Sequence, residues 1–211
     1  MKGNMDREKA LDLAKQTLLQ EADTLQALAD NLDDTFWQVA SLLSTCSEMI
    51  WITAVGTSAA VATRFAHILT CCGSRSMFLS PSNGLHGHAG VIQPEDILIA
   101  MSRGGETEEV IQMALIANDR EANTVAFVNN TDSSLAHACR YILPIQSPHQ
   151  YELMGYIATT STVAYSAVCD ALCAVVLDAK GYTPEKFAKT HPGGAVGRAL
   201  SSSNQNKEHQ E

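Results

Sequence analysis

The sequence predicts an α/β fold, in which a five-stranded parallel β-sheet lies between helices and carries an N-terminal helical hairpin. Three observations predict this fold class. Short apolar runs alternate with helical patterns over most of the chain, as in a parallel sheet that is covered on both faces. Several of these runs end in glycine, serine or threonine. The first 46 residues hold helical patterns with no strand between them.

Composition narrows the class of protein. The chain has 211 residues, which suits one domain with a sizeable core. Its formal net charge of −9 argues against nucleic acid or an anionic membrane surface as partner, because both need a basic patch. We find no secretion signal at the start and no apolar run of the ~18–20 residues that a membrane span needs. We therefore expect a cytoplasmic protein with six reduced cysteines.

Residues 1–46 are predicted to form two helices. Apolar residues recur there at three- and four-residue steps, namely Leu18, Ala22, Leu25, Ala29 and Leu32. Asp33-Asp34-Thr35 interrupts the pattern and can cap a second helix. We expect this hairpin to pack on the main domain, residues 47–200, or on a second subunit. A polar tail, residues 201–211, is expected to be disordered.

The remaining elements alternate in order. The predicted strands cover residues 49–55, 76–79, 96–101, 124–128 and 140–145. The predicted helices cover residues 59–69, 107–119, 134–139 and 154–179. Ligands of parallel sheets bind outside the carboxyl ends of the strands. The glycine- and hydroxyl-containing loops at residues 56–58, 102–107 and 129–133 are therefore the expected place for a site.

The loop after the third strand reads Ser102-Arg103-Gly104-Gly105-Glu106-Thr107. Its two glycines can adopt positive φ and let a ligand approach closely, while the next helix points unpaired N–H groups at an anion. On this stretch alone, an ordinary turn capped by Thr107 is an equal alternative. Two other stretches also carry hydroxyls, residues 56–58 and 159–162. They favour a phosphate-binding site, because three such loops can converge on one anion.

Two other ligand classes are disfavoured. The first loop, Gly56-Thr57-Ser58, has one of the three glycines of a dinucleotide fingerprint, and no Walker pattern occurs. His86-Gly87-His88 lacks the further nearby ligands that a zinc site needs. We expect no metal and no cofactor.

Two histidines are candidate acid–base groups. His86 lies in a glycine-containing loop, and His191 precedes Pro192-Gly193-Gly194. Imidazole titrates near neutrality, which suits it to proton transfer. A solvent-facing turn histidine is the alternative for both. His67 and His137 fall in helical patterns and are interpreted as structural.

Together these motifs resemble the sugar isomerase (SIS) domain and, more narrowly, its arabinose 5-phosphate isomerase branch. The resemblance runs over about residues 45–200 and is most specific in the closing His191-Pro192-Gly193-Gly194-x-x-Gly197-Arg198 element. It implies a flavodoxin-like or Rossmann-like parallel sheet. It also implies a homodimer or homotetramer with a shared active site and aldose–ketose interconversion of a phosphorylated sugar.

The chain departs from that branch at four positions. The branch has a lysine where this chain has Thr57, a second serine where it has Gly104, and an acid where it has His88. It also has a glutamate before the hydroxyl run. An ungapped alignment places Gln150 at that position. A shift of the alignment by two residues within the loop places Glu152 there instead.

The implied reaction proceeds through an enediol. His86 or His191 would open the sugar ring, and Glu152, or Glu106 in its place, would move the proton between neighbouring carbons. We expect partial burial to raise the pKa of Glu152 and strengthen it as a base. The residues expected to bind the phosphorylated sugar are Gly56, Thr57, Ser58, Ser102, Arg103, Gly105, Thr107, Thr160 and Ser161. Arg103 would supply the positive charge that is missing at Thr57.

Two rival functions remain open. The changes at Thr57 and Gln150 favour a protein that binds or senses a phosphosugar without catalysis. An enzyme of the same fold with different chemistry, such as amino-sugar phosphate processing, is the other alternative. The sequence does not specify the sugar.

Overall fold

The computed structural model describes residues 6–194 and residue 197. It confirms the predicted α/β class, with five parallel strands in the order β2-β1-β3-β4-β5. The strands are β1 (Ile50–Thr53), β2 (Ser76–Phe78), β3 (Ile97–Met101), β4 (Asn123–Val128) and β5 (Tyr141–Pro144). After β1 the chain adds β2 on one side of it, and then returns to add β3, β4 and β5 on the other side. The order in which strands are added therefore reverses between β1 and β3. The loops after these two strands therefore border the point where sheets of this order bind ligands.

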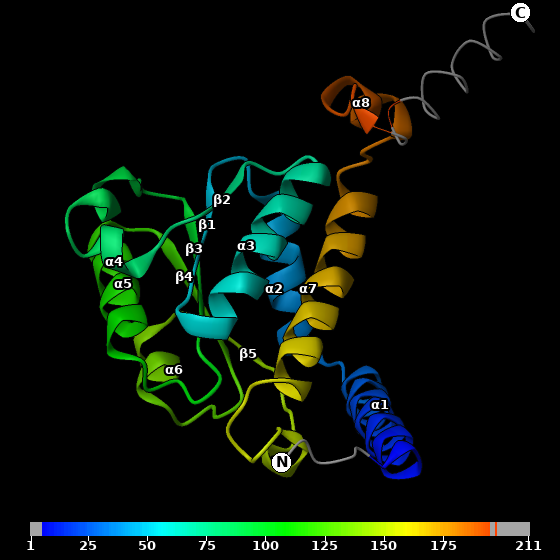
Figure 1. The fold of residues 1–211 in the computed structure, drawn as a ribbon. Coiled ribbons are helices and arrows are strands. Elements are labelled where there is room, and N and C mark those ends of the chain that lie inside the picture. The colour runs from blue at the N-terminus through cyan, green and yellow to red at the C-terminus, as the bar shows by residue number, and fades with distance from the viewer. Residues whose placement is uncertain (1–5, 195–196, 198–211) are drawn as a thin grey trace, which may run out of the picture.

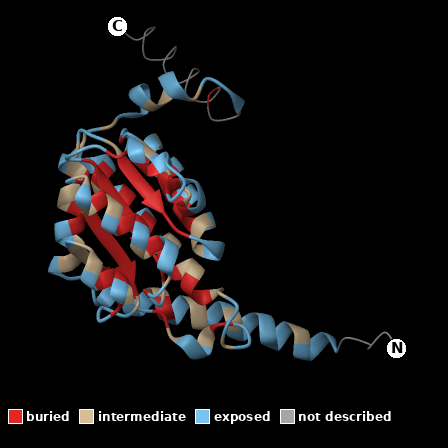
Figure 2. Cartoon of the chain, turned by 90° about the vertical axis from the view of Figure 1, so that its left-hand side faces the viewer, coloured by how far each residue is buried: buried red, intermediate tan, exposed pale blue. Residues whose placement is uncertain are grey.

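Helices cover both faces of the sheet (Figure 1). One face carries α2 (Asp34–Thr45), α3 (Gly56–Cys71) and α7 (Thr160–Ala179). The other carries α4 (Pro81–Gly84), the 3-10 helix η1 (His88–Val91), α5 (Glu108–Asp119) and α6 (Ser134–Ala138). Alternate strand residues face the two layers, so Ile50 and Ile52 pack toward α3, and Trp51 packs toward α5. Figure 2 shows the resulting buried sheet between helices with exposed outer faces.

The two expected N-terminal helices are present, and each packs against α7. Asp33 caps α2, and its carboxylate accepts a hydrogen bond of 2.9 Å from the amide of Thr35. The preceding helix, α1 (Arg7–Asp30), contacts α7 through its later turns, where Leu28 packs on the core. Its first turns extend away from the domain (Figure 2) and leave Leu11 and Leu18 more than half exposed.

The expected start of the long helix was wrong. It begins at Thr160, and not at residue 154. Residues 153–157 form a tight turn closed by a bridge between Leu153 and Ile157, with positive φ at Met154 and Gly155. Two adjacent positive-φ residues cannot continue an α-helix. The turn is preceded by a 3-10 helix, η2 (His149–Tyr151), and the chain later forms α8 (Pro184–Thr190). The expected disorder of residues 201–211 lies outside the described part of the chain.

Helix α7 also corrects the expectation that no apolar run is long enough for a membrane span. By length and composition alone α7 could cross a membrane. Half of that stretch is buried inside the domain, where α7 packs against α1, α2 and α3. A helix with protein neighbours on several sides is apolar around most of its circumference. Its composition is therefore explained by its place in the core.

Candidate functional site

A small cavity lies at the carboxyl edge of the sheet, where α3 and α7 begin. Its volume is about 40 Å³, and it is lined by Ser58 and Val61 of α3, by Arg103, and by Ala158, Ser161, Thr162 and Tyr165. One buried water needs only ~10–15 Å³. The cavity therefore has room for a compact polar group. Three of the residues expected to bind a phosphorylated sugar, Ser58, Arg103 and Ser161, come together here.

Helix α3 presents its start to this cavity. No side chain among the described residues caps it, and its first residue, Gly56, has a φ of +58°. That left-handed conformation explains why a glycine follows β1. The unpaired N–H groups of the first turn and the helix dipole together favour an anion beside Ser58.

Helices α3 and α7 are tied to each other along their length. The Arg64 guanidinium forms two hydrogen bonds with the Asp170 carboxylate, at 2.7 and 3.0 Å. Paired bonds of this kind fix geometry even where partial exposure makes their net stabilisation small. The pair helps to keep Ser58 and Ser161 on opposite sides of the same cavity.

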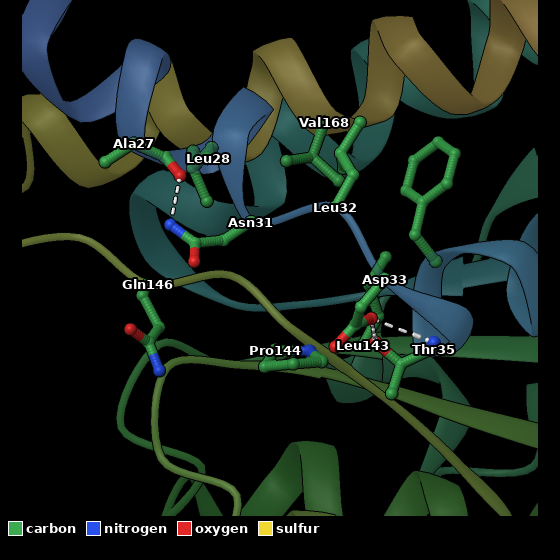
Figure 3. Close-up of a pocket in the computed structure, with 11 residues that line it drawn as sticks. Ala27, Leu28, Asn31, Leu32, Asp33, Thr35, Leu143, Pro144, Gln146 and Val168 are labelled. Atoms are coloured by element: carbon green, nitrogen blue, oxygen red, sulfur yellow. Dashed lines mark hydrogen bonds between the residues drawn. The ribbon is translucent and has the colours of Figure 1, made fainter.

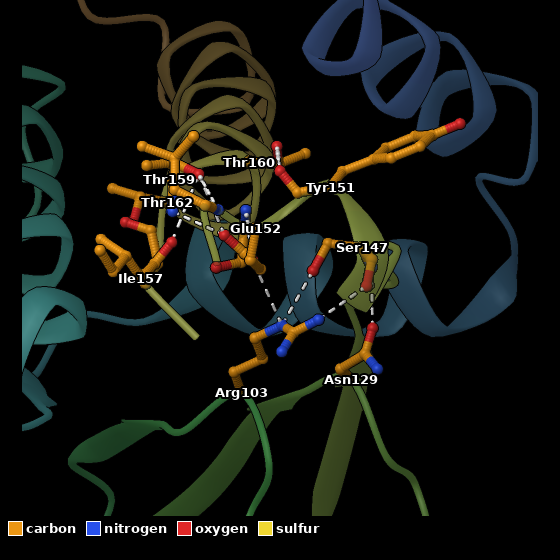
Figure 4. Close-up of polar contacts among 12 residues, drawn as sticks. Arg103, Asn129, Ser147, Tyr151, Glu152, Ile157, Thr159, Thr160 and Thr162 are labelled. Atoms are coloured by element: carbon orange, nitrogen blue, oxygen red, sulfur yellow. Dashed lines mark hydrogen bonds and ion pairs between the residues drawn. The ribbon is translucent and has the colours of Figure 1, made fainter. Parts of the chain in front are cut away.

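Glu152 lies beside the cavity and is held as the cap of α7 (Figure 4). Its side chain is 2% exposed. One carboxylate oxygen accepts a hydrogen bond of 2.6 Å from the amide of Thr159, and the other accepts one of 3.0 Å from the amide of Ser161. The second oxygen also lies 3.6 Å from Nε of Arg103. Glu152 is thus the carboxylate that the structure brings to the site.

The pKa of Glu152 differs from the expectation. Burial raises it, but hydrogen bonds from Ser161 and Thr159 and the charge of Arg103 together hold the pKa below its ordinary value of 4.5. The expectation that burial makes Glu152 a stronger base is therefore wrong for the unliganded chain. Burial was foreseen, but the amides of the α7 start were not, because the helix was expected to begin earlier.

Arg103 is positioned by three strand-end loops (Figure 4). Its Nε donates to the hydroxyl of Ser147 at 3.2 Å, and its Nη2 donates to the Ser147 carbonyl at 3.0 Å. Asn129 links the loops, since its side-chain oxygen accepts from the Ser147 amide at 2.7 Å and its own amide donates to the Arg103 carbonyl at 2.9 Å. The sequence analysis placed the loop of Asn129 at the expected site, but it did not include Ser147. The position of Ser147 after β5 is the signal that could have found it.

Several expected ligand residues bind their own loops instead of lining the cavity. The hydroxyls of Ser102 and Thr107 lie 2.9 Å apart, and Ser102 accepts a bond of 3.2 Å from the amide of Gly105. The hydroxyl of Thr160 donates to the carbonyl of Tyr151 at 3.0 Å. These bonds shape the loops that carry Arg103 and Glu152. Thr57 is exposed in the first turn of α3.

The Glu106 carboxylate binds the start of a different helix, α6. It accepts bonds from the amide of Ser134 at 3.0 Å and from the Ser134 hydroxyl at 2.6 Å. These two bonds lower the pKa of the exposed Glu106 carboxyl. Its position is that of a helix cap, separate from the carboxylate of Glu152.

The two candidate histidines lie away from Glu152 within one chain. His191 follows α8, stacks on Phe187 and has its Nε2 3.6 Å from Sγ of Cys71, at the end of α3. Ser58 lies at the start of that helix, and thirteen residues at 1.5 Å per residue put the two ends roughly 20 Å apart. His86 is exposed between α4 and η1, which pack against α5 on the other face. A single chain therefore keeps His191 away from the cavity, and His86 is not among the described residues that line it.

Sequence reasoning missed Tyr165. It lies four residues after Ser161 on α7, is 4% exposed and lines the cavity. Its hydroxyl has no hydrogen-bond partner within the described ranges, 6–194 and 197. In the sequence it is one aromatic residue in an apolar helical pattern, where a core role is the default interpretation. Its helical spacing from the hydroxyl run was the available signal.

A second cavity, of about 310 Å³, lies between the α1–α2 turn, β5 and α7 (Figure 3). Two of its polar residues already have partners: the Asn31 side chain donates to the Ala27 carbonyl, and Asp33 accepts from Thr35. No residue expected to bind or transform a ligand lines this cavity among those described. We therefore assign the candidate site to the cavity between α3 and α7.

Comparisons with known proteins agree with this fold. The SIS domain model matches residues 43–175. The Escherichia coli arabinose 5-phosphate isomerase KpsF is 32% identical over 187 residues, which are 88% of this chain and 59% of that protein. The chain thus spans less than three-fifths of that relative's length.

Solved structures show the same architecture. A candidate sugar-phosphate isomerase from Listeria monocytogenes has a TM-score of 0.86 at 29% identity, covering 90% of this chain and 100% of that one. An Escherichia coli CFT073 protein in complex with arabinose 5-phosphate has a TM-score of 0.85 at 23% identity, covering 89% and 100%. The second likeness supports the fold alone.

Proposed function

The chain belongs to the SIS domain family, and from this premise we propose that it is an aldose–ketose isomerase of a phosphorylated sugar. The substrate would be of the arabinose 5-phosphate type, and the reaction would pass through an enediol. One observation carries the proposal: an uncapped helix start, Ser58, Arg103 and Ser161 surround a cavity beside the buried carboxylate of Glu152. Such a reaction needs a phosphate-binding site next to a group that transfers a proton.

Arg103 would bind the phosphate. Two of its nitrogens are engaged by Ser147, and Nη1 makes no hydrogen bond to any residue that the structure describes. A guanidinium keeps its charge at all relevant pH values and cannot act as a base. Arg103 would therefore supply the charge that the related enzymes place at the position of Thr57, without supplying a proton acceptor.

Glu152 would move the proton between the two carbons. Its lowered pKa means that it is ionised at neutral pH and able to accept a proton. A phosphate bound against Arg103 would bring a second negative charge near Glu152 and raise its pKa toward the range that suits a base. Substrate binding and activation of the base would then be linked through Arg103.

His86 and His191 would reach the site from neighbouring subunits of a homodimer or homotetramer. Two observations favour a shared site. His191 lies at the far end of α3 from Ser58, and the turn next to Glu152 exposes Met154 and Tyr156 by 84% and 87%. Apolar side chains this exposed beside a polar site are typical of a surface that another protein covers.

A specific observation also favours a second function, binding of a phosphosugar without turnover. Both oxygens of Glu152 already accept hydrogen bonds from amides at the start of α7. A carboxylate held in this way is a good helix cap and a weak base. Under this alternative, Glu152 stabilises the cavity and the ligand binds unchanged.

A panel of pentose and hexose phosphates separates the two functions. Each is tested for thermal stabilisation of the protein against the same sugar without phosphate, and stabilising compounds are then tested for turnover. The isomerase predicts stabilisation by a phosphorylated sugar together with its conversion. Stabilisation without conversion supports the binder, and no stabilisation by any sugar phosphate would reject both.

A further inference from the structure

The hydroxyl of Tyr165 is buried without a partner. The residue is 4% exposed, and its oxygen is among the few buried side-chain atoms that have no hydrogen bond within the described part of the chain. Burying an unpaired hydroxyl costs free energy, so native structures keep few of them without a reason. The position of this hydroxyl suggests a reason.

Tyr165 lines the same cavity as Ser58, Arg103 and Ser161. It follows Ser161 by one turn of α7 and therefore projects from the same face of the helix. Arg103 is close enough for its charge to act on the phenol: burial raises the pKa of Tyr165, and Arg103 offsets part of that rise. The net shift is upward, so the hydroxyl keeps its proton and can donate it in a hydrogen bond.

Among the described lining residues, the polar groups are Arg103 and several hydroxyls, which stand beside the apolar Val61 and Ala158, and none of the lining side chains is anionic. Arg103 offers a cation, Ser58 and Ser161 offer hydroxyls, and the start of α3 offers N–H groups. This set matches the oxygens of a phosphoryl group, which can accept several hydrogen bonds at once.

We infer that Tyr165 is a ligand-binding residue, whose hydroxyl donates a hydrogen bond to a phosphoryl oxygen held in this cavity beside Arg103. The inference rests on the proposed function, because it takes the phosphorylated sugar as the ligand. It adds to that function a donor that explains how this chain binds phosphate with Thr57 where a lysine is expected. The donor comes from the second turn of α7, not from a strand-end loop.

A purely structural role for Tyr165 makes a different prediction. The ring packs in the core between α3, α7 and the sheet. If packing were its whole purpose, removal of the hydroxyl alone would leave ligand affinity unchanged. Tyr165→Phe separates the two roles because it keeps the ring and removes one oxygen.

The test measures binding of inorganic phosphate and of arabinose 5-phosphate by titration calorimetry to the wild type and to Tyr165→Phe. Tyr182→Phe is the matched control, since that ring packs on Gly73 at the opposite end of α3. We expect Tyr165→Phe to weaken both ligands about tenfold or more, as for loss of a bond to a charged group. We expect Tyr182→Phe to bind as the wild type does.

Two further readouts make the result decisive. The urea midpoint of the unliganded Tyr165→Phe protein should equal or exceed that of the wild type, because the variant buries no unpaired hydroxyl. Equal affinities in the two proteins, or a lower midpoint in the variant, would overturn the inference. Wild type that binds arabinose 5-phosphate and converts no sugar phosphate of the panel rejects the isomerase and leaves Tyr165 as a ligand residue, whereas wild type that binds neither compound overturns the inference.

Discussion

Nε of Arg103 lies 3.6 Å from a carboxylate oxygen of the buried Glu152, and each side chain is fixed there by a different part of the chain. Ser147 holds the guanidinium, and the amides of Thr159 and Ser161 hold the carboxylate. A positive group that faces the cavity is therefore in electrostatic contact with the Glu152 carboxylate beside it. Any anion that binds Arg103 will alter the protonation of Glu152.

Replacement of Glu152 by glutamine should remove catalysis, and it also replaces one of the two oxygens that accept hydrogen bonds from the start of α7 by an amide nitrogen. Glu152→Gln retains the length of the side chain and loses the proton acceptor. We expect the isomerisation rate to fall by about 10²- to 10⁴-fold, the usual contribution of a general base. Initial rates followed by NMR of the sugar phosphate measure this loss.

Glu106→Gln is the matched control for that experiment. Glu106 is a carboxylate on a neighbouring loop that caps α6 through Ser134. We expect its rate to stay within about threefold of the wild type, since removal of an exposed cap acts mainly on stability. Similar losses in the two variants would show that proton transfer does not depend on Glu152 in particular.

Stability should fall at acid pH through Glu152. Its pKa is lower in the folded chain than its ordinary value of 4.5, so the folded state binds this proton less readily than the unfolded state does. The contribution is fully present above pH 4.5 and is lost as the pH falls through the folded pKa. Urea unfolding from pH 7 to pH 3 should show this fall in the wild type and a smaller fall in Glu152→Gln. Parallel curves for the two proteins would contradict the lowered pKa.

Gly105 and Gly104 should respond differently to alanine. Gly105 has a φ of +73°, and a β-carbon there would overlap the side chain of Ser133. We expect Gly105→Ala to lower the free energy of unfolding by roughly 2–4 kcal/mol, from backbone strain and overpacking. At Gly104 no described atom lies within 4 Å of the β-carbon position. Gly104→Ala should stay within about 1 kcal/mol of the wild type, and equal effects in chemical denaturation would contradict this difference.

A shared site predicts complementation between inactive variants. Glu152→Gln and His191→Ala should each be inactive alone, because each removes one side of every site. After mixing through reversible dissociation, some sites in mixed oligomers would combine an intact Glu152 with an intact His191. We expect activity to reappear in the mixture, measured against each variant remixed with itself. A mixture as inactive as its components would mean that the two residues do not meet between subunits.

The sheet could be predicted from sequence because local patterns determine it. Each apolar run is short and is followed by a helical pattern, so the five strands and their parallel direction followed directly. The start of α7 could not be predicted in the same way. Residues 154–159 continue the apolar pattern, but Met154 and Gly155 adopt positive φ and end any helix that would include them.

The site was partly predictable for the same reason. Ser58, Arg103 and Ser161 follow strands or begin helices, so sheet topology brought them together. The capping of α7 by Glu152 depends on where that helix starts, and the separation of His191 from the cavity depends on the length of α3. Neither relation is visible in local residue patterns. The role of Tyr165 could not be predicted from the sequence, because only the packed structure shows that its hydroxyl is buried without a partner among the described residues.

Deuterium wash-in at C2 of a sugar phosphate is the most direct measurement of the proposed function. The protein is incubated in D₂O with arabinose 5-phosphate and with related pentose and hexose phosphates, and C2 is followed by NMR. We expect deuterium to enter C2 of at least one compound with wild type, and not with Glu152→Gln. Folded wild-type protein that binds these compounds and exchanges no proton at C2 of any of them would contradict isomerisation.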